Sequence, residues 1–306
     1  MPTRRIGNSE LEVSVVGLGC NQFGGRLDLA GTRAVVDAAL DVGVTFLDTA
    51  DTYGGAGGSE ELLGQVLEGR RDRVVLATKF GMDMGDGRGP RGSRAYIRKA
   101  AEASLRRLRT DVIDLYQYHV PDGVTPIAET LEALDELVRA GKVRHIGCSN
   151  FSAAQLEQAD RIARDRGLAR FISVQNEYSL LDRTIELDVV PMAQRVRVGV
   201  IPYFPLARGL LTGKYHRNEP PPEGTRLAGR SGVATDAQFD KIEALERYAA
   251  QRGLRLLDVA IGGLAAQPAV ASVIAGATRP EQVRANAAAA HWASSAADIA
   301  ELNALA

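Results

Sequence analysis

Short runs of apolar, β-branched residues alternate with longer amphipathic segments along most of the chain. Each short run has the length of a β-strand, and a strand–helix alternation indicates parallel strands joined by helical crossovers. Eight such runs in 306 residues predict an α/β fold of the closed (β/α)8 TIM-barrel type rather than an open doubly wound sheet. The eight runs are residues 15–20, 45–50, 74–80, 114–119, 144–150, 173–178, 199–206 and 270–277.

The segments between the strands carry apolar residues at helical spacing, and three further features complete the predicted barrel. Residues 3–14 form two short alternating runs around Gly7-Asn8, which predicts a hairpin that plugs the barrel floor. The segment 207–266 predicts an insertion before the last strand, and a helix is expected after Pro280. No change in composition divides the chain, so residues 1–306 are expected to form a single domain. The other expected helices are 31–42, 93–108, 126–140, 152–166, 187–197, 236–252 and 255–266.

Composition and charge exclude several classes of protein. The formal net charge of -1 gives no electrostatic footprint for nucleic acid or an anionic membrane. Cys20 and Cys148 are too few and too far apart for a disulfide framework or a zinc site, so buried reduced thiols and no metal are expected. The N-terminus lacks an apolar signal segment, and glycines and a proline interrupt the longest apolar stretch, 259–277. A cytoplasmic location is therefore expected.

The glycines in GLGCNQFGG do not form a dinucleotide fingerprint. Gly17 and Gly19 have the correct spacing, but Gln22 occupies the third glycine position and no helix opens there. The chain also lacks a P-loop, an HExxH motif and a GxSxG motif. A ligand is therefore expected to bind at the carboxyl ends of the strands, where barrel active sites lie.

Alternation of side chains along three consecutive strands places ionisable groups on one face. Phe46 and Asp48 share a face with Ala50, and the same alternation puts Lys79 and His119 on the inward face of the next two strands. Taken alone, Asp48 could be a turn residue, Lys79 a solvated lysine and His119 a core histidine. Their coincidence at the tops of neighbouring strands predicts an active site, with Tyr53 on the following loop folded over it.

These residue types form a coherent chemical set. A buried Lys79 ammonium is expected to stabilise the Tyr53 phenolate and lower the pKa of the phenol, while Asp48 neutralises the lysine. His119 can donate a hydrogen bond to a carbonyl oxygen. No serine or cysteine nucleophile is paired with a base, so a hydride carrier fits. Asp51 is expected to be a loop hydrogen-bond acceptor, and Ser59 to begin the next helix.

Several segments resemble the aldo-keto reductase superfamily in order and spacing across essentially the whole chain. The resemblance implies a (β/α)8 barrel and NAD(P)H-dependent reduction of aldehydes and ketones, with Asp48, Tyr53, Lys79 and His119 as the catalytic residues and Tyr53 as general acid. The matching segments are GLGC (17–20), LDTADTYGGAGGSEELLG (47–64), ATKFG (77–81), DLYQYHVPD (114–122), GKVRHIGCSNF (141–151), VQNEYSLLDR (174–183), PLARGLLTGKY (205–215) and IAGATRPEQVRAN (274–286).

The resemblance also implies positions for a cofactor extended across the barrel mouth. Ser149, Asn150 and Gln175 would contact the nicotinamide carboxamide, and Tyr203 would stack on the nicotinamide ring. On the loop after the seventh strand, the residues that would hold the pyrophosphate are Leu206, Arg208, Gly209 and Lys214. Around the start of the last helix, the residues that would hold the adenosine 2′-phosphate are Gly276, Thr278, Arg279, Gln282 and Asn286.

Departures from the family pattern leave some functional questions open. Thr278 stands where related bacterial members often have an arginine, and the adjacent Arg279 is expected to replace it, which favours NADPH with NADH as the alternative. Phe204 replaces a small polar residue and either narrows the pyrophosphate groove or points into the core. The alternatives to a carbonyl reductase are an oxidative sugar or alcohol dehydrogenase, a cofactor-binding regulatory protein, and a cofactor-independent lyase or isomerase.

The partner is expected to be a small-molecule carbonyl substrate, with no nucleic acid and no membrane. The sequence does not identify that substrate or an oligomeric state. Substrate specificity is expected to depend on the loops after the strands, here 22–30, 81–93 and 207–235.

Overall fold

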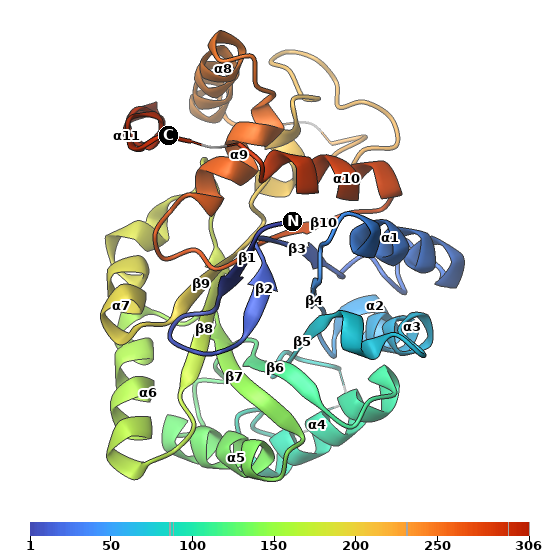
Figure 1. Cartoon of the computed structure of the whole chain (residues 1–306), viewed down its shortest axis with the longest axis vertical. Coiled ribbons are helices and arrows are strands. Elements are labelled where there is room, and N and C mark those ends of the chain that lie inside the picture. Colours follow the sequence, from blue (N-terminus) through green and yellow to red (C-terminus); the bar gives the residue numbers. More distant parts are fainter. Residues whose placement is uncertain (86, 88, 231, 293, 306) are drawn as a thin grey trace.

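The computed structural model describes residues 1–85, 87, 89–230, 232–292 and 294–305, and eight parallel strands form its central sheet. The sheet closes almost completely: Val200 N donates to Ala269 O and Ala271 N donates to Val200 O, both at 2.8 Å (Figure 1). The predicted (β/α)8 barrel is confirmed. In sheet order the strands are β10 (Val273–Gly276), β3 (Val16–Gly19), β4 (Phe46–Asp48), β5 (Val75–Phe80), β6 (Ile113–Tyr118), β7 (Val143–Ser149), β8 (Phe171–Glu177) and β9 (Gly199–Tyr203).

Helices surround this sheet and begin at residues that satisfy their free backbone amides. Asp28, Ser93, Ser152 and Thr235 each accept a hydrogen bond from an N–H in the first turn of the helix that follows. None of the helices in the described part of the chain is both long enough and apolar enough to cross a membrane. The helices are α1 (Leu29–Asp41), α2 (Tyr53–Ala56), α3 (Gly58–Val66), α4 (Arg94–Leu108), α5 (Ile127–Arg139), α6 (Ala153–Arg166), α7 (Val189–Val196), α8 (Asp236–Gln251), α9 (Leu256–Ala265), α10 (Pro280–Ala289) and α11 (Ala296–Leu305), with 3-10 turns η1 (Arg71–Arg73), η2 (Thr184–Leu187) and η3 (Ala207–Thr212).

The N-terminal hairpin lies across one end of the barrel, as predicted (Figure 1). Its strands β1 (Thr3–Arg5) and β2 (Glu12–Ser14) pair antiparallel, with Arg5 opposite Glu12, so the connection is longer than a two-residue turn. Apolar residues of the hairpin bury themselves against the inward face of the barrel strands. This inner cluster includes Ile6, Leu11, Val13, Phe46, Ala77, Leu115, Ile172, Ile201, Ala271 and Ile274.

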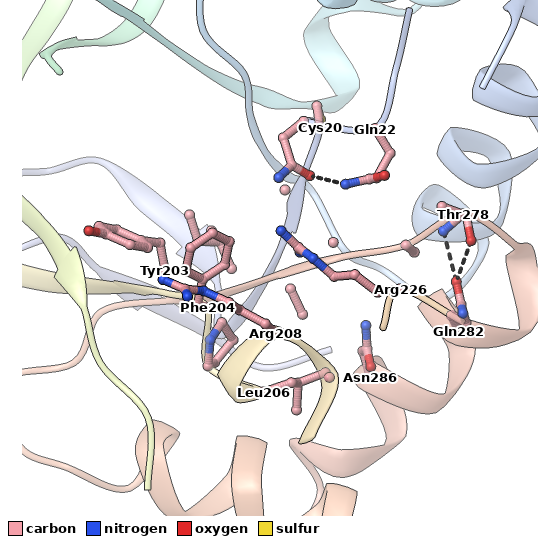
Figure 2. Close-up of a pocket in the computed structure, with 18 of the residues that line it drawn as sticks. Cys20, Gln22, Tyr203, Phe204, Leu206, Arg208, Arg226, Thr278, Gln282 and Asn286 are labelled. Carbon is pink, nitrogen blue, oxygen red and sulfur yellow. Dashed lines mark hydrogen bonds between the residues drawn. The ribbon is translucent and has the colours of Figure 1, made fainter. Parts of the chain in front are cut away.

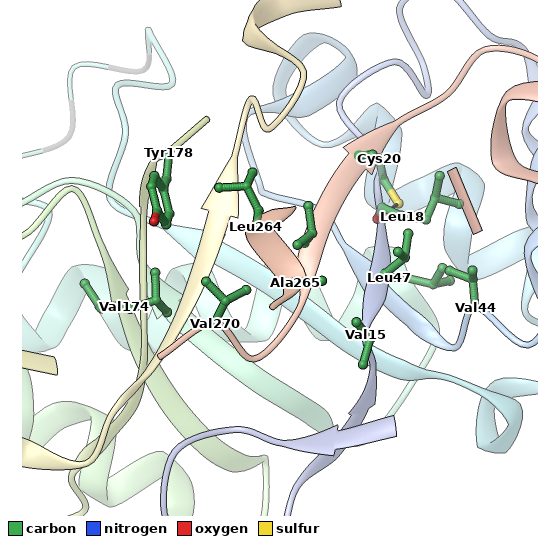
Figure 3. Packing of buried hydrophobic residues seen from close by; sticks show 14 of the residues in the cluster. Val15, Leu18, Cys20, Val44, Leu47, Val174, Tyr178, Leu264, Ala265 and Val270 are labelled. Atoms are coloured by element: carbon green, nitrogen blue, oxygen red, sulfur yellow. Dashed lines mark hydrogen bonds between the residues drawn. The ribbon is translucent and has the colours of Figure 1, made fainter. Parts of the chain in front are cut away.

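A second and larger core fills the space between the strands and the helices (Figure 3). Leu47 and Val174 face outward from their strands into this core, whereas Phe46 next to Leu47 faces inward. Strands buried on both faces therefore lack the alternation of a half-exposed sheet and appear as the continuous apolar runs seen in the sequence.

The expected insertion lies between β9 and β10. It consists of η3, an irregular segment, α8 and α9, all near the C-terminal helices in Figure 1. The expected specificity loops 81–93 and 207–235 include positions 86, 88 and 231, which lie outside the described residues.

The turn after β4 differs from the predicted helix start. The helix α3 begins at Gly58, and Ser59 is a buried residue inside its first turn rather than its cap. The Ser59 hydroxyl donates to Cys20 O at 2.9 Å and bonds the Thr49 hydroxyl at 2.8 Å. Ser59 therefore ties the β4 turn to the end of β3, which positions the residues between them.

Candidate active site

Asp48, Tyr53 and Lys79 meet at the carboxyl ends of β4 and β5, as the sequence predicts. The Lys79 Nζ atom donates to Asp48 Oδ2 at 2.6 Å, to Thr49 O at 2.9 Å and to Tyr53 OH at 3.4 Å. The His119 ring lies edge-on to Tyr53, with 5.9 Å between the ring centroids. The three strand-end residues and Tyr53 thus form one cluster.

The inward alternation of the strands explains why these polar groups lie above an apolar floor. Phe46, Ala77 and Leu115 belong to the inner core, and the next inward residues along their strands are Asp48, Lys79 and Gln117. Gln117 Nε2 donates to Asp48 Oδ1 at 3.1 Å. Gln117 lies two residues before His119, so the same alternation puts it on this face, and the hydrogen bond makes it part of the network.

Gln175 is a second amide that contacts Asp48, in addition to lining the cavity as the resemblance implies. Its Nε2 atom donates to Asp48 Oδ1 at 3.1 Å, and the side chain is buried beneath the cluster. The Gln175 side chain also lines the cavity, so a ligand in the cavity can contact the same amide group that donates to Asp48. Two glutamines therefore satisfy the second carboxylate oxygen of Asp48 while Lys79 satisfies the first.

Glycine makes the sharp turn after Tyr53 possible. Gly54 and Gly55 have φ angles of 71° and 77°, in the left-handed region that residues with a side chain rarely adopt. A Cβ atom on Gly54 would lie 2.5 Å from Phe23 O, so the turn also packs closely on the loop after β3. The Tyr53 side chain is held over Lys79 by this arrangement.

Burial changes the predicted titration of Tyr53. Desolvation raises the Tyr53 pKa, and the nearby Lys79 charge offsets that effect only in part, so the net pKa lies above the ordinary tyrosine value. The expectation that Lys79 lowers the Tyr53 pKa was therefore wrong in its net sign. Desolvation alone would lower the Lys79 pKa, but Asp48 and Tyr53 outweigh it and raise the pKa. Tyr53 is a neutral phenol beside a charged ammonium.

His119 is held in its neutral form. Burial, together with the Lys79 charge, lowers the His119 pKa to about 3. Its Nδ1 atom is buried without a hydrogen-bond partner among the described residues, and the ring lines the cavity. A neutral imidazole can donate a hydrogen bond from one nitrogen without taking up a proton.

Asp51 lies on the loop after β4 and accepts a backbone hydrogen bond from Thr52, as expected, but it is also buried. It is only 2% exposed, and its Oδ1 atom has no hydrogen-bond partner among the described residues. Burial, and then the charge of Glu60, raise the Asp51 pKa to about 7. Asp51 alternates with Ala50 and faces outward from the barrel wall, on the opposite side from Asp48.

A cavity of about 1080 Å³ opens above this cluster, and the residues expected to contact a nicotinamide line one part of it. Ser149 Oγ donates to Gln175 O at 2.8 Å, and Asn150 Nδ2 donates to His119 O at 3.0 Å. Tyr203 OH donates to Asn150 Oδ1 at 2.8 Å. The structure brings Ser149, Asn150 and Tyr203 together with His119 in one hydrogen-bonded group.

Cationic side chains line another part of the same cavity. Arg208 and Lys214 lie there as expected, and two arginines that sequence analysis did not identify, Arg26 and Arg226, join them. Figure 2 shows Arg226 projecting into the cavity between the Tyr203–Phe204 side and the Thr278–Gln282 side. Burial and the charges of Arg26, Arg208 and Arg230 lower the Arg226 pKa, so this arginine lies in a net positive environment.

Phe204 points into the cavity rather than into the core. The guanidinium groups of Arg208 and Arg226 each lie 5.1 Å from the centre of its ring. Arg208 also pairs with Glu177 at 3.5 Å. Phe204 therefore holds the two arginines at the cavity wall, and no signal in one sequence could have shown this contact.

The start of α10 supplies the remaining expected residues. Gln282 Oε1 accepts hydrogen bonds from Thr278 N at 2.8 Å and from Arg279 N at 3.2 Å (Figure 2 shows the Thr278 contact). Arg279 is exposed, and Asn286 is buried one turn beyond Gln282. Gly276, Thr278, Arg279, Gln282 and Asn286 line the cavity on this side, and the expected Leu206 and Gly209 line it next to Arg208.

Comparison with known proteins agrees with this geometry. Residues 15–306 match the model of the family described as "Aldo/keto reductase family". The chain is 36% identical over 310 residues to "Aldo-keto reductase YhdN" of Bacillus subtilis, covering 97% of this chain and 91% of that protein. It is 34% identical to "Probable voltage-gated potassium channel subunit beta" of Oryza sativa (92% and 89% covered), and 33% identical to "L-glyceraldehyde 3-phosphate reductase" of Escherichia coli (94% and 86% covered). The chain therefore belongs to the aldo/keto reductase family of NAD(P)H-dependent oxidoreductases, which act on carbonyl compounds.

Proposed function

We propose that this enzyme is an NADPH-dependent reductase that converts aldehydes or ketones to alcohols, with Tyr53 as the general acid. The observation that carries the proposal is the contact between the neutral Tyr53 phenol and the Lys79 ammonium, 3.4 Å apart, below a cavity with cationic walls. The catalytic residues in this proposal are Asp48, Tyr53, Lys79 and His119, all on the single domain of residues 1–306.

The cavity has the donor chemistry that a dinucleotide requires. Ser149, Asn150 and Gln175 offer hydroxyl and amide groups for a carboxamide, and Tyr203 offers a ring surface. Leu206, Arg208, Gly209 and Lys214 would hold the pyrophosphate, with Arg26 and Arg226 beside them. A bound reduced nicotinamide supplies the hydride.

The α10 end of the cavity supports NADPH over NADH. The N-terminus of α10 favours an anion, and the exposed Arg279 adds a guanidinium next to it. Gly276, Thr278, Gln282 and Asn286 complete this seat for an adenosine 2′-phosphate. NADH remains the alternative cofactor, because it would lack only the contacts of these residues with the 2′-phosphate.

The roles of the catalytic residues follow from their protonation states. Tyr53 transfers its proton to the developing alkoxide, and the Lys79 ammonium stabilises the phenolate that remains. Asp48 balances the lysine charge, which would otherwise be unpaired in the barrel interior. Neutral His119 donates a hydrogen bond that orients the substrate carbonyl oxygen.

The named relatives suggest other functions that the site favours less. One relative is named as a potassium-channel subunit, which would correspond to cofactor binding with little turnover. The complete set of four catalytic residues supports turnover instead. Oxidation of a sugar or alcohol would use the same groups with Tyr53 as base, and the net rise of the Tyr53 pKa favours the acid role.

Two free buried cysteines and a nucleotide cofactor support a cytoplasmic location.

A binding and turnover assay with both cofactors tests the proposal. NADPH should quench the intrinsic fluorescence of the protein and should be oxidised when a panel of aldehydes, ketones and sugars is added. NADH should bind more weakly. A protein that responds to neither cofactor would overturn the oxidoreductase proposal, and one that binds NADPH without oxidising it would support the regulatory alternative.

A further inference from the structure

Charged side chains are distributed unevenly around the cavity. Apart from Asp48, the charged residues that line it in the described part of the chain come from the loops after β3 and β9, the insertion, and the start of α10. The wall at the ends of β5, β6 and β7 carries no charged side chain among its described lining residues. The charged lining residues are Arg26, Asp48, Arg208, Lys214, Glu223, Arg226 and Arg279.

The uncharged wall presents two apolar side chains to the cavity. Met82 lies three residues after Lys79, and Val120 directly follows His119, so both flank the catalytic groups. They are 39% and 36% exposed, respectively. We call Met82 and Val120 the apolar wall.

Local packing fixes the path of the chain into this wall. Gly81 has a φ angle of 106°, and a Cβ atom there would lie 2.7 Å from the Tyr118 ring. The start of the loop after β5 therefore packs directly on β6, the strand that leads into His119 and Val120. The backbone at the base of Met82 is thereby set beside the end of β6.

Single exposed apolar residues are common on proteins and need no explanation. Only five large hydrophobic residues in the described part of the chain are exposed, and two of these five line the cavity beside the catalytic residues. A third, Val124, is on the same loop as Val120. Leu187 is 84% exposed at η2 and does not line the cavity, so it is an example of a single exposed apolar residue that needs no explanation.

We propose that the substrate carbonyl bears an uncharged, apolar substituent that lies on the apolar wall of Met82 and Val120. The cationic residues lie on the side assigned to the cofactor, so the described residues that line the substrate side offer no charged partner for an ionised group. The substrate class is therefore a neutral aliphatic or aromatic aldehyde or ketone rather than a sugar phosphate or a polyol. The inference rests on the proposed carbonyl-reductase function.

Three aldehydes of different polarity test this inference. The kcat/KM of the wild-type enzyme is to be measured with saturating NADPH for hexanal, glyceraldehyde and glyceraldehyde 3-phosphate. Because burial of methylene groups on an apolar surface is favourable, the kcat/KM for hexanal should exceed that for both polar aldehydes by at least about tenfold. An equal or reversed preference, with glyceraldehyde 3-phosphate ahead, would overturn the inference.

Polar substitutions of similar size locate the effect. Met82→Gln and Val120→Thr should raise KM for hexanal with little change in kcat, because the apolar contact is the same in the ground and transition states. The loss of kcat/KM should be several times larger for hexanal than for glyceraldehyde. Leu187→Gln is the matched control and should leave kcat/KM unchanged for both aldehydes. Equal losses on both aldehydes would contradict the assigned contact.

The assay separates the two proposals. If no aldehyde is reduced with either cofactor, the proposed carbonyl-reductase function fails. If the aldehydes are reduced but hexanal has no advantage, or if the two polar substitutions leave the hexanal KM unchanged, the function stands and the apolar wall is wrong.

Discussion

Lys79 donates a 2.6 Å hydrogen bond to Asp48 in the barrel interior, where the two side chains are 0% and 2% exposed. Buried ion pairs depend on both partners, because the desolvation cost of one charge is offset only by the other. The pair holds an ammonium beside Tyr53, and this is the feature on which the proposed chemistry depends.

Asp48→Asn should destabilise the protein by about 3–5 kcal/mol, because it leaves Lys79 buried without a counter-charge. The double variant Asp48→Asn/Lys79→Met should recover much of this loss, since it removes both charges. Chemical unfolding at neutral pH measures the free energy of unfolding of each variant. A double variant as unstable as the single one would show that lost packing, not an unpaired charge, causes the effect.

Asp51→Asn should stabilise the protein at neutral pH. Because the folded-state pKa of about 7 lies above the usual value near 4, the wild type loses stability as the pH rises from about 4 to 7 and then reaches a plateau. The neutral variant lacks this loss, so its advantage should grow over that window to at most about 4 kcal/mol. Thermal unfolding across pH 4–8 tests this, with the exposed Asp83→Asn as control. A constant difference at every pH would contradict the raised Asp51 pKa.

The activity of the enzyme should show no histidine titration. The His119 pKa of about 3 means that the ring stays neutral throughout the range in which an ordinary histidine titrates. We expect kcat/KM for aldehyde reduction to be level between about pH 5 and 8. An acidic limb near the ordinary histidine pKa, absent in His119→Gln, would contradict the neutral assignment.

Arg279→Ala should weaken NADPH binding much more than NADH binding. A charge-assisted hydrogen bond contributes about 1.5–3 kcal/mol, which corresponds to a roughly 10- to 100-fold rise in the NADPH Kd. Arg226→Ala should weaken both cofactors similarly, because the proposed pyrophosphate contact is common to them. Arg284, exposed on the same helix and outside the cavity lining, provides the control Arg284→Ala. Equal losses of NADPH and NADH in Arg279→Ala would place the 2′-phosphate elsewhere.

Sequence alone predicted the parts of the site that depend on periodicity. Alternation along β4, β5 and β6 places Asp48, Lys79 and His119 on one inward face, and barrel topology then brings neighbouring strand ends together. Gln117 follows the same alternation, and the structure adds its hydrogen bond to Asp48. The face on which a side chain lies can therefore be predicted in regular elements, because backbone geometry fixes the alternation.

The features that sequence analysis missed depend on burial or on irregular loops. The net Tyr53 pKa follows from a competition between desolvation and Lys79, and its sign requires the packed environment. The burial of Asp51 depends on the helices that cover the outer face of the barrel. Arg26 and Arg226 belong to the loops 22–30 and 207–235, and an irregular loop does not indicate which of its side chains face the cavity.

The rate of NADPH oxidation by Tyr53→Phe, compared with wild type on the same aldehyde, tests the central proposal most directly. Loss of the proton donor should reduce kcat by about 10²- to 10⁴-fold, while the fluorescence-derived Kd for NADPH and the thermal stability stay unchanged. A Tyr53→Phe variant that binds NADPH and reduces the aldehyde at the wild-type rate would contradict the assignment of Tyr53 as the general acid.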